Sequence, residues 1–117
     1  MYGAIIIDRP HLAPGAREFL IVQSELYLGP QGQPGNYAKM LRSQPDAVVF
    51  NGYLNQYLFS SVQVQAGQRV RIWVLDAGPS DDCAFHMVGA RFDTIFNSGA
   101  YPLQPGNRAG APARPST

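Results

Sequence analysis

The chain has 117 residues, a formal net charge of +1, 45% hydrophobic residues and 15% charged residues. This length suits one small domain, and the balanced charge excludes the strongly basic face that a nucleic-acid partner requires. The hydrophobic content excludes a disordered chain, and no apolar run approaches the roughly 18 residues of a membrane span, so we expect no membrane partner. Twelve Gly and ten Pro favour short strands joined by turns over long helices.

The first residues are predicted to form a buried strand. Residues 4–7 are a short apolar run that ends before Asp8 and Pro10. The start lacks the basic region and the long apolar region of a signal peptide, so the chain as written is expected to stay in the cytoplasm. Residues 11–16, which contain Pro and Gly, are predicted to be a linker.

The middle of the chain predicts two strands with a short helix between them. Residues 18–28 begin apolar and end alternating, which indicates a strand that passes from a covered region to a half-exposed one. After a Gly/Pro loop, Asn36 is a suitable cap for a short helix that runs to Arg42. The compact apolar run at residues 47–50, followed by Asn51 and Gly52, predicts the second strand.

Four further segments are predicted to be strands, at residues 58–65, 69–75, 83–88 and 92–96. Six or seven short strands with one helical interruption indicate an all-β fold, an antiparallel sandwich or barrel. The alternation predicts one inward-facing set: Val22, Val49, Phe50, Val70, Ile72, Val74, Phe85 and Met87. Residues 102–117 show no periodicity and are expected to be disordered.

The chain has two histidines, and their surroundings differ. His11 lies in the predicted linker, where a solvated side chain is expected. His86 lies within the predicted strand 83–88, on the face opposite Phe85 and Met87. A metal site needs three or four ligands, and no second histidine is near, so the residues alone favour a half-exposed or hydrogen-bonded imidazole.

Other residues with possible chemistry have simpler interpretations. The single cysteine, Cys83, excludes an internal disulfide and lies three residues before His86, on the opposite face of an extended strand; a buried, inert thiol is expected. Asp76, Asp81 and Asp82 lack the ligand spacing of a calcium loop, so they are predicted to be solvated carboxylates.

A series of motifs occurs in a recognisable order along the chain: Val-Gln-Ser-Glu-Leu-Tyr at 22–27, Val-Phe-Asn-Gly-Tyr at 49–53, residues 69–79, Phe-His-Met-Val-Gly at 85–89, and residues 92–101. This order resembles the second cupredoxin domain of the multicopper oxidase family, in particular the copper nitrite reductase type. The resemblance implies a Greek-key β-barrel, incomplete at its C-terminal end. It assigns residues 1–10 to the last strand of a preceding cupredoxin domain, 11–16 to a linker, 17–103 to a partial cupredoxin-like domain and 104–117 to a tail.

The resemblance also implies a site. His86 matches the histidine at the interdomain copper, the catalytic site, where it is a ligand or orients a bound oxygen species. Met1 matches the axial methionine of the type 1 copper in the pattern Met-x-Gly-x-Ile-x-Val, or it is only the initiator. Copper is then the cofactor of a longer, exported or periplasmic protein that reduces dioxygen or nitrite. The preceding cupredoxin domain or a neighbouring subunit, as in a homo-oligomer, is the implied partner.

The chain is accordingly interpreted as a fragment of a copper-dependent oxidoreductase that is inactive alone. Two alternatives stay open. The first is a non-catalytic β-sandwich that binds a partner or self-associates, because missing strands leave edges that pair with another chain. The second is a stand-alone copper carrier, which the lack of a Cys-His-Met cluster on one face disfavours.

Overall fold

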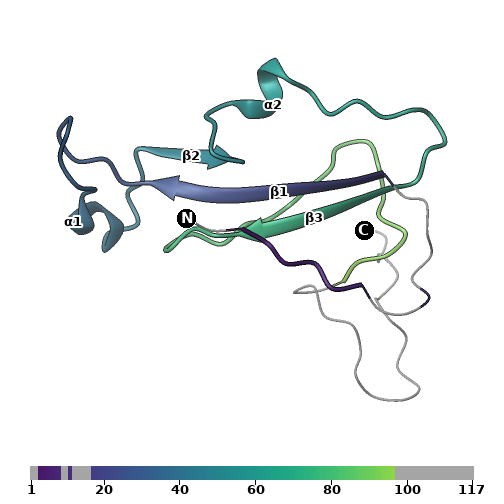
Figure 1. Ribbon diagram of the computed structural model, residues 1–117, viewed down its shortest axis with the longest axis horizontal. Coiled ribbons are helices and arrows are strands. Elements are labelled where there is room, and N and C mark those ends of the chain that lie inside the picture. The colour runs from purple at the N-terminus through teal and green to yellow at the C-terminus, as the bar shows by residue number, and fades with distance from the viewer. Residues whose placement is uncertain (1–2, 9–10, 12–16, 97–117) are drawn as a thin grey trace, which may run out of the picture. The chain divides into compact units, whose positions relative to one another are not determined.

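The computed structural model describes residues 3–8, 11 and 17–96 (Figure 1). The chain divides into two units, one formed by Met1–Ile7 and Leu12–Ala84 and the other by Asp8–His11 and Phe85–Thr117. The predicted tail at 104–117 lies outside the described residues, as does most of the predicted linker. The division into domains therefore stays a prediction.

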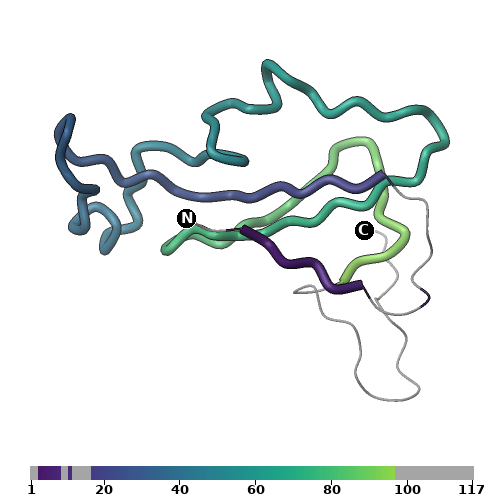
Figure 2. Tube along the Cα trace, in the orientation of Figure 1, coloured from purple at the N-terminus to yellow at the C-terminus, as the bar shows by residue number. Residues whose placement is uncertain are grey.

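The first unit contains an open three-stranded sheet in the order β2-β1-β3 (Figures 1 and 2). The strands are β1 (Arg17–Leu26), β2 (Ala47–Phe50) and β3 (Val70–Asp76). Strand β1 pairs antiparallel with β2 and parallel with β3. An all-β class is therefore confirmed, and a Greek-key cupredoxin fold stays a prediction. The prediction of a wholly antiparallel sheet is wrong for β1 and β3, because the long connection between them allows a parallel crossover.

Two short helices lie between the strands, α1 (Tyr37–Met40) and α2 (Gln56–Phe59), whereas one was predicted. Asn36 is the N-cap of α1, and its Oδ1 accepts a hydrogen bond from Lys39 N at 3.1 Å. Helix α1 ends at Met40, two residues earlier than predicted, and Ser43 has a left-handed φ of 48° that directs the chain away from a longer helix. No helix in the described residues is long and apolar enough to cross a membrane.

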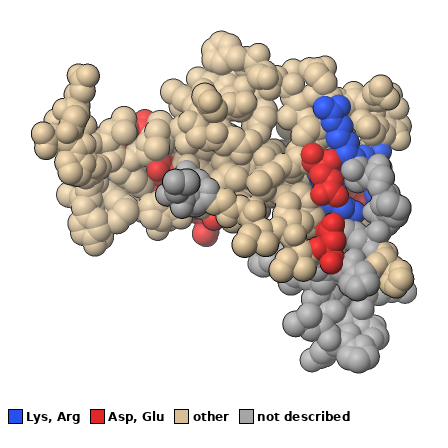
Figure 3. Space-filling view, in the orientation of Figure 1, with Lys and Arg blue, Asp and Glu red and all other residues tan. Residues whose placement is uncertain are grey.

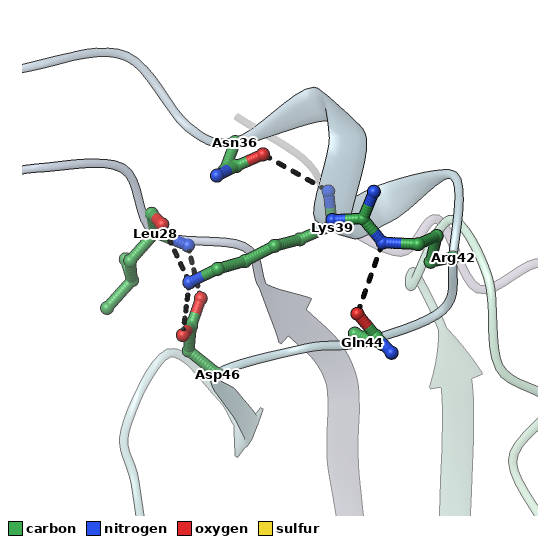
Figure 4. Close-up of polar contacts among 6 residues, drawn as sticks. All are labelled: Leu28, Asn36, Lys39, Arg42, Gln44 and Asp46. Carbon is green, nitrogen blue, oxygen red and sulfur yellow. Dashed lines mark hydrogen bonds and ion pairs between the residues drawn. The ribbon is translucent and has the colours of Figure 1, made fainter.

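A cluster of polar contacts around Lys39 closes the connection from β1 to β2 (Figure 4). Lys39 Nζ donates to Leu28 O at 3.2 Å and to Asp46 Oδ1 at 2.6 Å. The other carboxylate oxygen, Asp46 Oδ2, accepts from Leu28 N at 2.7 Å. Asp46 therefore holds both the end of β1 and helix α1 at the entry to β2.

Four predicted strands, at residues 4–7, 58–65, 83–88 and 92–96, are not strands in the structure, although Ile95 forms a single β-bridge. Alternating or apolar residues give a preference for extended backbone, but a strand also needs a laterally hydrogen-bonded neighbour. Within the described part of the chain, the three-stranded sheet does not include these segments. Part of 58–65 belongs instead to α2, and Ile5 and Ile7 are exposed by 91% and 78%.

The predicted inward-facing set is also divided between the two faces of the sheet. The register pairs Phe19 with Ile72 and Ile21 with Val74, so Val74 shares a face with these residues. Val22 pairs with Leu75 and lies on the opposite face, which it shares with Val49. Among the described hydrophobic residues, one is buried, Val49, which is 2% exposed. Val74 and Phe85, which were predicted to face inward, are each 38% exposed. A single sealed core is therefore not present in the described residues.

Strand β1 is buried at the opposite end from the prediction. Its C-terminal half contains Gln23, Ser24 and Glu25, which are 9%, 3% and 7% exposed. Its N-terminal half was expected to be covered, yet Glu18 and Leu20 are exposed. The reversal has a tertiary cause, because the loop that follows β3 is hydrogen-bonded to the C-terminal half.

Candidate functional site

His86 lies in the second unit, in a segment that belongs to no strand or helix, and it is exposed. Of its two neighbours, Phe85 is exposed and Met87 is half-buried. The ring of Phe85 lies 6.0 Å from that of Phe92, at an interplanar angle of 41°, a favourable aromatic geometry. The segment thus has a local apolar contact beside a solvent-accessible imidazole.

The loop at residues 77–83 leads from β3 toward His86, and Asp76 organises it. Asp76 Oδ1 accepts from Gly78 N at 3.2 Å, and Oδ2 accepts from Cys83 N at 3.0 Å. Ala77 N donates to Gln23 O at 2.9 Å. Asp76 is exposed, as predicted for a solvated carboxylate, and both of its oxygens also accept from loop N–H groups.

Glu25 is a buried carboxylate that sequence reasoning missed. Its Oε1 accepts from Asp81 N at 2.8 Å, and its Oε2 accepts from the Tyr27 hydroxyl. Partial burial, together with the hydrogen bond to Glu25, raises the pKa of Tyr27. The alternation of residues 23–27 gives no signal for this burial, because Asp81 is 56 positions from Glu25 in the sequence.

Cys83 is half-buried and carries a free thiol. Burial, followed by the negative charge of Asp76, raises the pKa of the Cys83 thiol. The thiolate is the form that binds metals, so this environment disfavours Cys83 as a copper ligand. It is consistent with the inert thiol that the sequence predicts.

Asn51, within the motif at 49–53, holds β1 where β2 ends. Its backbone N donates to Val22 O at 2.8 Å, and its Oδ1 accepts from Val22 N at 2.8 Å. Its Nδ2 donates to Leu20 O at 3.1 Å and to Tyr57 Oη at 2.6 Å. Asn51 adopts a left-handed φ of 50°, which Asn tolerates better than most residues. The Asn-Gly pair after an apolar run signals such a turn, but not the hydrogen bonds that the side chain makes.

The described residues do not complete a copper site. No three side chains of His, Cys, Asp or Glu come together among them in a way that could hold a metal ion. Copper needs three or four ligands, and His86 supplies one imidazole. His11 is exposed, and Met1 lies outside the described residues. The metal-site roles of His86 and Met1 therefore stay predictions.

Comparison with known proteins finds relatives for most of the chain. No family model matches, and no solved structure matches significantly. Copper-containing nitrite reductases of Neisseria meningitidis serogroup A and Neisseria gonorrhoeae are both 35% identical over 106 residues, which cover 85% of this chain. The matched region makes up 28% of the first protein and 27% of the second.

The matched proteins are much longer than the matched region, so this chain spans little more than a quarter of the length of the curated relatives. The name that they share agrees with the family indicated by the ordered motifs from 22–27 to 92–101. The resemblance is therefore confirmed, and this chain is a relative, over that part of their sequence, of the copper-containing nitrite reductases.

Proposed function

We propose that this chain is part of a copper-dependent oxidoreductase similar to the copper-containing nitrite reductases. The observation that carries the proposal is the 35% identity to these proteins across 85% of the chain. The cofactor of the complete protein is copper, and its electron acceptor is nitrite or dioxygen. We expect the 117-residue chain alone to be inactive, because His86 supplies one of the three or four ligands that copper needs.

His86 is the residue that we assign to the copper site of the complete protein. A neutral imidazole is a good ligand for copper, and the exposed side chain of His86 is accessible to a group outside this chain. The remaining ligands come from a preceding cupredoxin domain or from a neighbouring subunit. His86 either binds the copper or orients a bound oxygen species beside it.

The open sheet supports a place within a larger structure. Many large hydrophobic side chains of the described residues are exposed, and Val49 is the buried one. Exposed apolar surface of this extent commonly marks a region that another polypeptide segment covers. We propose that residues 17–103 form part of a Greek-key cupredoxin domain whose other strands lie elsewhere in the complete protein.

The proposal is tested in a chimera in which this chain replaces the matching segment of the Neisseria gonorrhoeae protein. His86→Ala is compared with His11→Ala, because both remove an exposed imidazole. We expect His86→Ala to abolish nitrite reduction and to preserve the blue absorption of a remote type 1 copper, and His11→Ala to change neither. Full turnover of the His86→Ala protein, at full copper content, would show that His86 is not at the site.

The exposed apolar surface also supports a second candidate, a module that self-associates. Tyr53, Leu54, Leu58 and Phe59, in and beside α2, are 67%, 59%, 75% and 83% exposed. Most of the surface on the face shown in Figure 3 is uncharged, and its charged side chains are of both signs. Sedimentation equilibrium of the chain distinguishes the two candidates. A monomer at high concentration contradicts self-association, and a stable dimer that Phe59→Glu dissociates supports it.

A further inference from the structure

We propose that Glu25 and Asp76 are positioning residues that bind the loop at 77–83 to the sheet and thereby fix the point from which the chain continues to His86. We call these two carboxylates and the loop the loop clamp. The inference rests on the proposed function, because the placement of His86 matters only if His86 acts at the copper site of the complete protein. The contacts of the loop clamp themselves do not depend on it.

The two carboxylates come from neighbouring strands and bind successive points of the same loop. Asp76, the last residue of β3, accepts from the N–H groups of Gly78 and Cys83, at 3.2 and 3.0 Å. Glu25, on the central strand β1, accepts from Asp81 N at 2.8 Å. Hydrogen bonds to a carboxylate are stronger than those between neutral groups, so these three contacts restrain the loop along most of its length.

The burial of Glu25 explains why its bonds matter to the loop. Glu25 is 7% exposed, and a buried carboxylate is costly unless donors satisfy its oxygens. The loop N–H of Asp81 is one donor, and the hydroxyl of Tyr27 is the other. If the loop moved away, Glu25 would lose this donor, so the position of the loop and the hydrogen bonding of the carboxylate are energetically linked.

Gly78 shows how closely the loop approaches both carboxylates. A Cβ atom on Gly78 would overlap Glu25 Oε1 and would lie 3.4 Å from Asp76 Oδ1. Glycine suits this position for a steric reason, since a larger side chain at residue 78 would collide with the carboxylate of Glu25. Gly78→Ala therefore displaces that carboxylate without removing any polar atom from the loop clamp.

A further contact ties the loop to helix α1. Ser80 Oγ donates to Met40 O at 3.2 Å, at the C-terminal end of the helix. The loop is thus held by β1, β3 and α1. The last of these fixed points, Cys83 N, is three residues before His86, and three residues span at most about 10 Å of extended chain. Fixing Cys83 therefore limits the volume within which the backbone of His86 moves.

The test uses the 117-residue chain, with amide hydrogen exchange and backbone order parameters measured by NMR. Glu25→Gln, Asp76→Asn and Gly78→Ala are compared with Glu18→Gln, which alters a carboxylate of β1 that is hydrogen-bonded to Arg71 and Trp73 instead of the loop. We expect the loop-clamp variants to raise exchange at Asp81 and Cys83 by about tenfold or more and to lower the order parameters of residues 84–88. Exchange in β1 and β2 should stay unchanged.

Two results would overturn the inference. Unchanged exchange of the loop in all three variants would show that the carboxylates do not hold it. An equal rise in the loop, β1 and β2 would show that they only stabilise the sheet as a whole. Gly78→Ala keeps both carboxylates, so it remains informative if Glu25→Gln fails to fold.

The outcome is separable from that of the proposed function. The proposed function fails if His86→Ala leaves nitrite reduction by the chimera unchanged, whatever the loop does. The positioning role fails if the loop-clamp variants leave the motion of residues 77–88 unchanged, whatever the chimera does. Each readout belongs to one hypothesis.

Discussion

The two halves of strand β1 differ in what surrounds them. Residues 17–22 pair with β3, and their side chains are exposed or half-buried. Residues 23–26 pair with β2 and include the three buried polar residues Gln23, Ser24 and Glu25. One continuous strand thus has a solvent-accessible half and a buried half, and the boundary lies near Val22.

The difference shows that the described sheet buries polar side chains where hydrogen bonds satisfy them, beside the one buried hydrophobic residue, Val49. The buried carboxylate of Glu25 is satisfied by the loop N–H of Asp81 and by the Tyr27 hydroxyl. In the exposed half, Glu18 pairs with Arg71 and accepts from Trp73 Nε1 at 3.0 Å. An ion pair near solvent contributes about 0–1 kcal/mol, so the exposed half depends more on its backbone pairing.

The largest stability effect that we predict is at Val49, in strand β2 beside the buried half of β1. Val49 is 2% exposed and pairs with Ser24, whereas the adjacent Val48 is 39% exposed. Val49→Ala should lower the free energy of unfolding by about 2 kcal/mol, through lost burial and a residual cavity. Val48→Ala is the matched control and should cost about 0.5 kcal/mol, a typical surface value. Urea unfolding measures both, and equal losses would contradict the contrast between the two faces.

A smaller effect is expected at Asn51, which follows β2 and binds Val22 and Leu20 in the exposed half of β1. Asn51→Ala should cost about 1.5 kcal/mol more than Asn55→Ala, because it leaves backbone groups of β1 without their side-chain partner. Asn55 is the matched control, since it also has a left-handed φ, of 57°, and makes no capping hydrogen bond with its side chain. The strain of placing Ala at positive φ is common to both variants. Similar losses in both would show that the hydrogen bonds of Asn51 contribute little.

Part of this architecture could be predicted from local sequence. The strand at 47–50 has the predicted bounds, because a compact apolar run ends at Asn51 and Gly52. Strand β3 begins and ends one residue later than predicted. Asn36 caps α1 as expected, since its side chain reaches a backbone N–H only three residues away. These features depend on neighbours in the sequence.

The rest depends on contacts between distant residues. Val62 and Val64 alternate with polar residues as in a strand, yet the described sheet gives their segment no partner. The burial of Glu25 requires a loop more than fifty residues later, which no periodicity reports. His86 was singled out because of the family resemblance. Its exposed side chain is observed, but its partners at a metal site are not among the described residues.

The smallest predicted effect concerns Asp46, at the end of the connection from the buried half of β1. A hydrogen bond from Lys39, followed by one from Leu28 N, lowers the pKa of Asp46 below the usual value of 3.8. The ionised form therefore favours the folded state, and this contribution is present above the unfolded pKa and is lost as the pH falls through the lower folded pKa. We expect Asp46→Asn to reduce stability at neutral pH and the difference from the unsubstituted chain to vanish in acid. Urea midpoints between about pH 7 and about pH 2 measure it, and a difference that does not depend on pH would contradict the pairing. In a Lys39→Met background, Asp46→Asn should have a smaller effect at neutral pH, since Leu28 N is then the remaining donor.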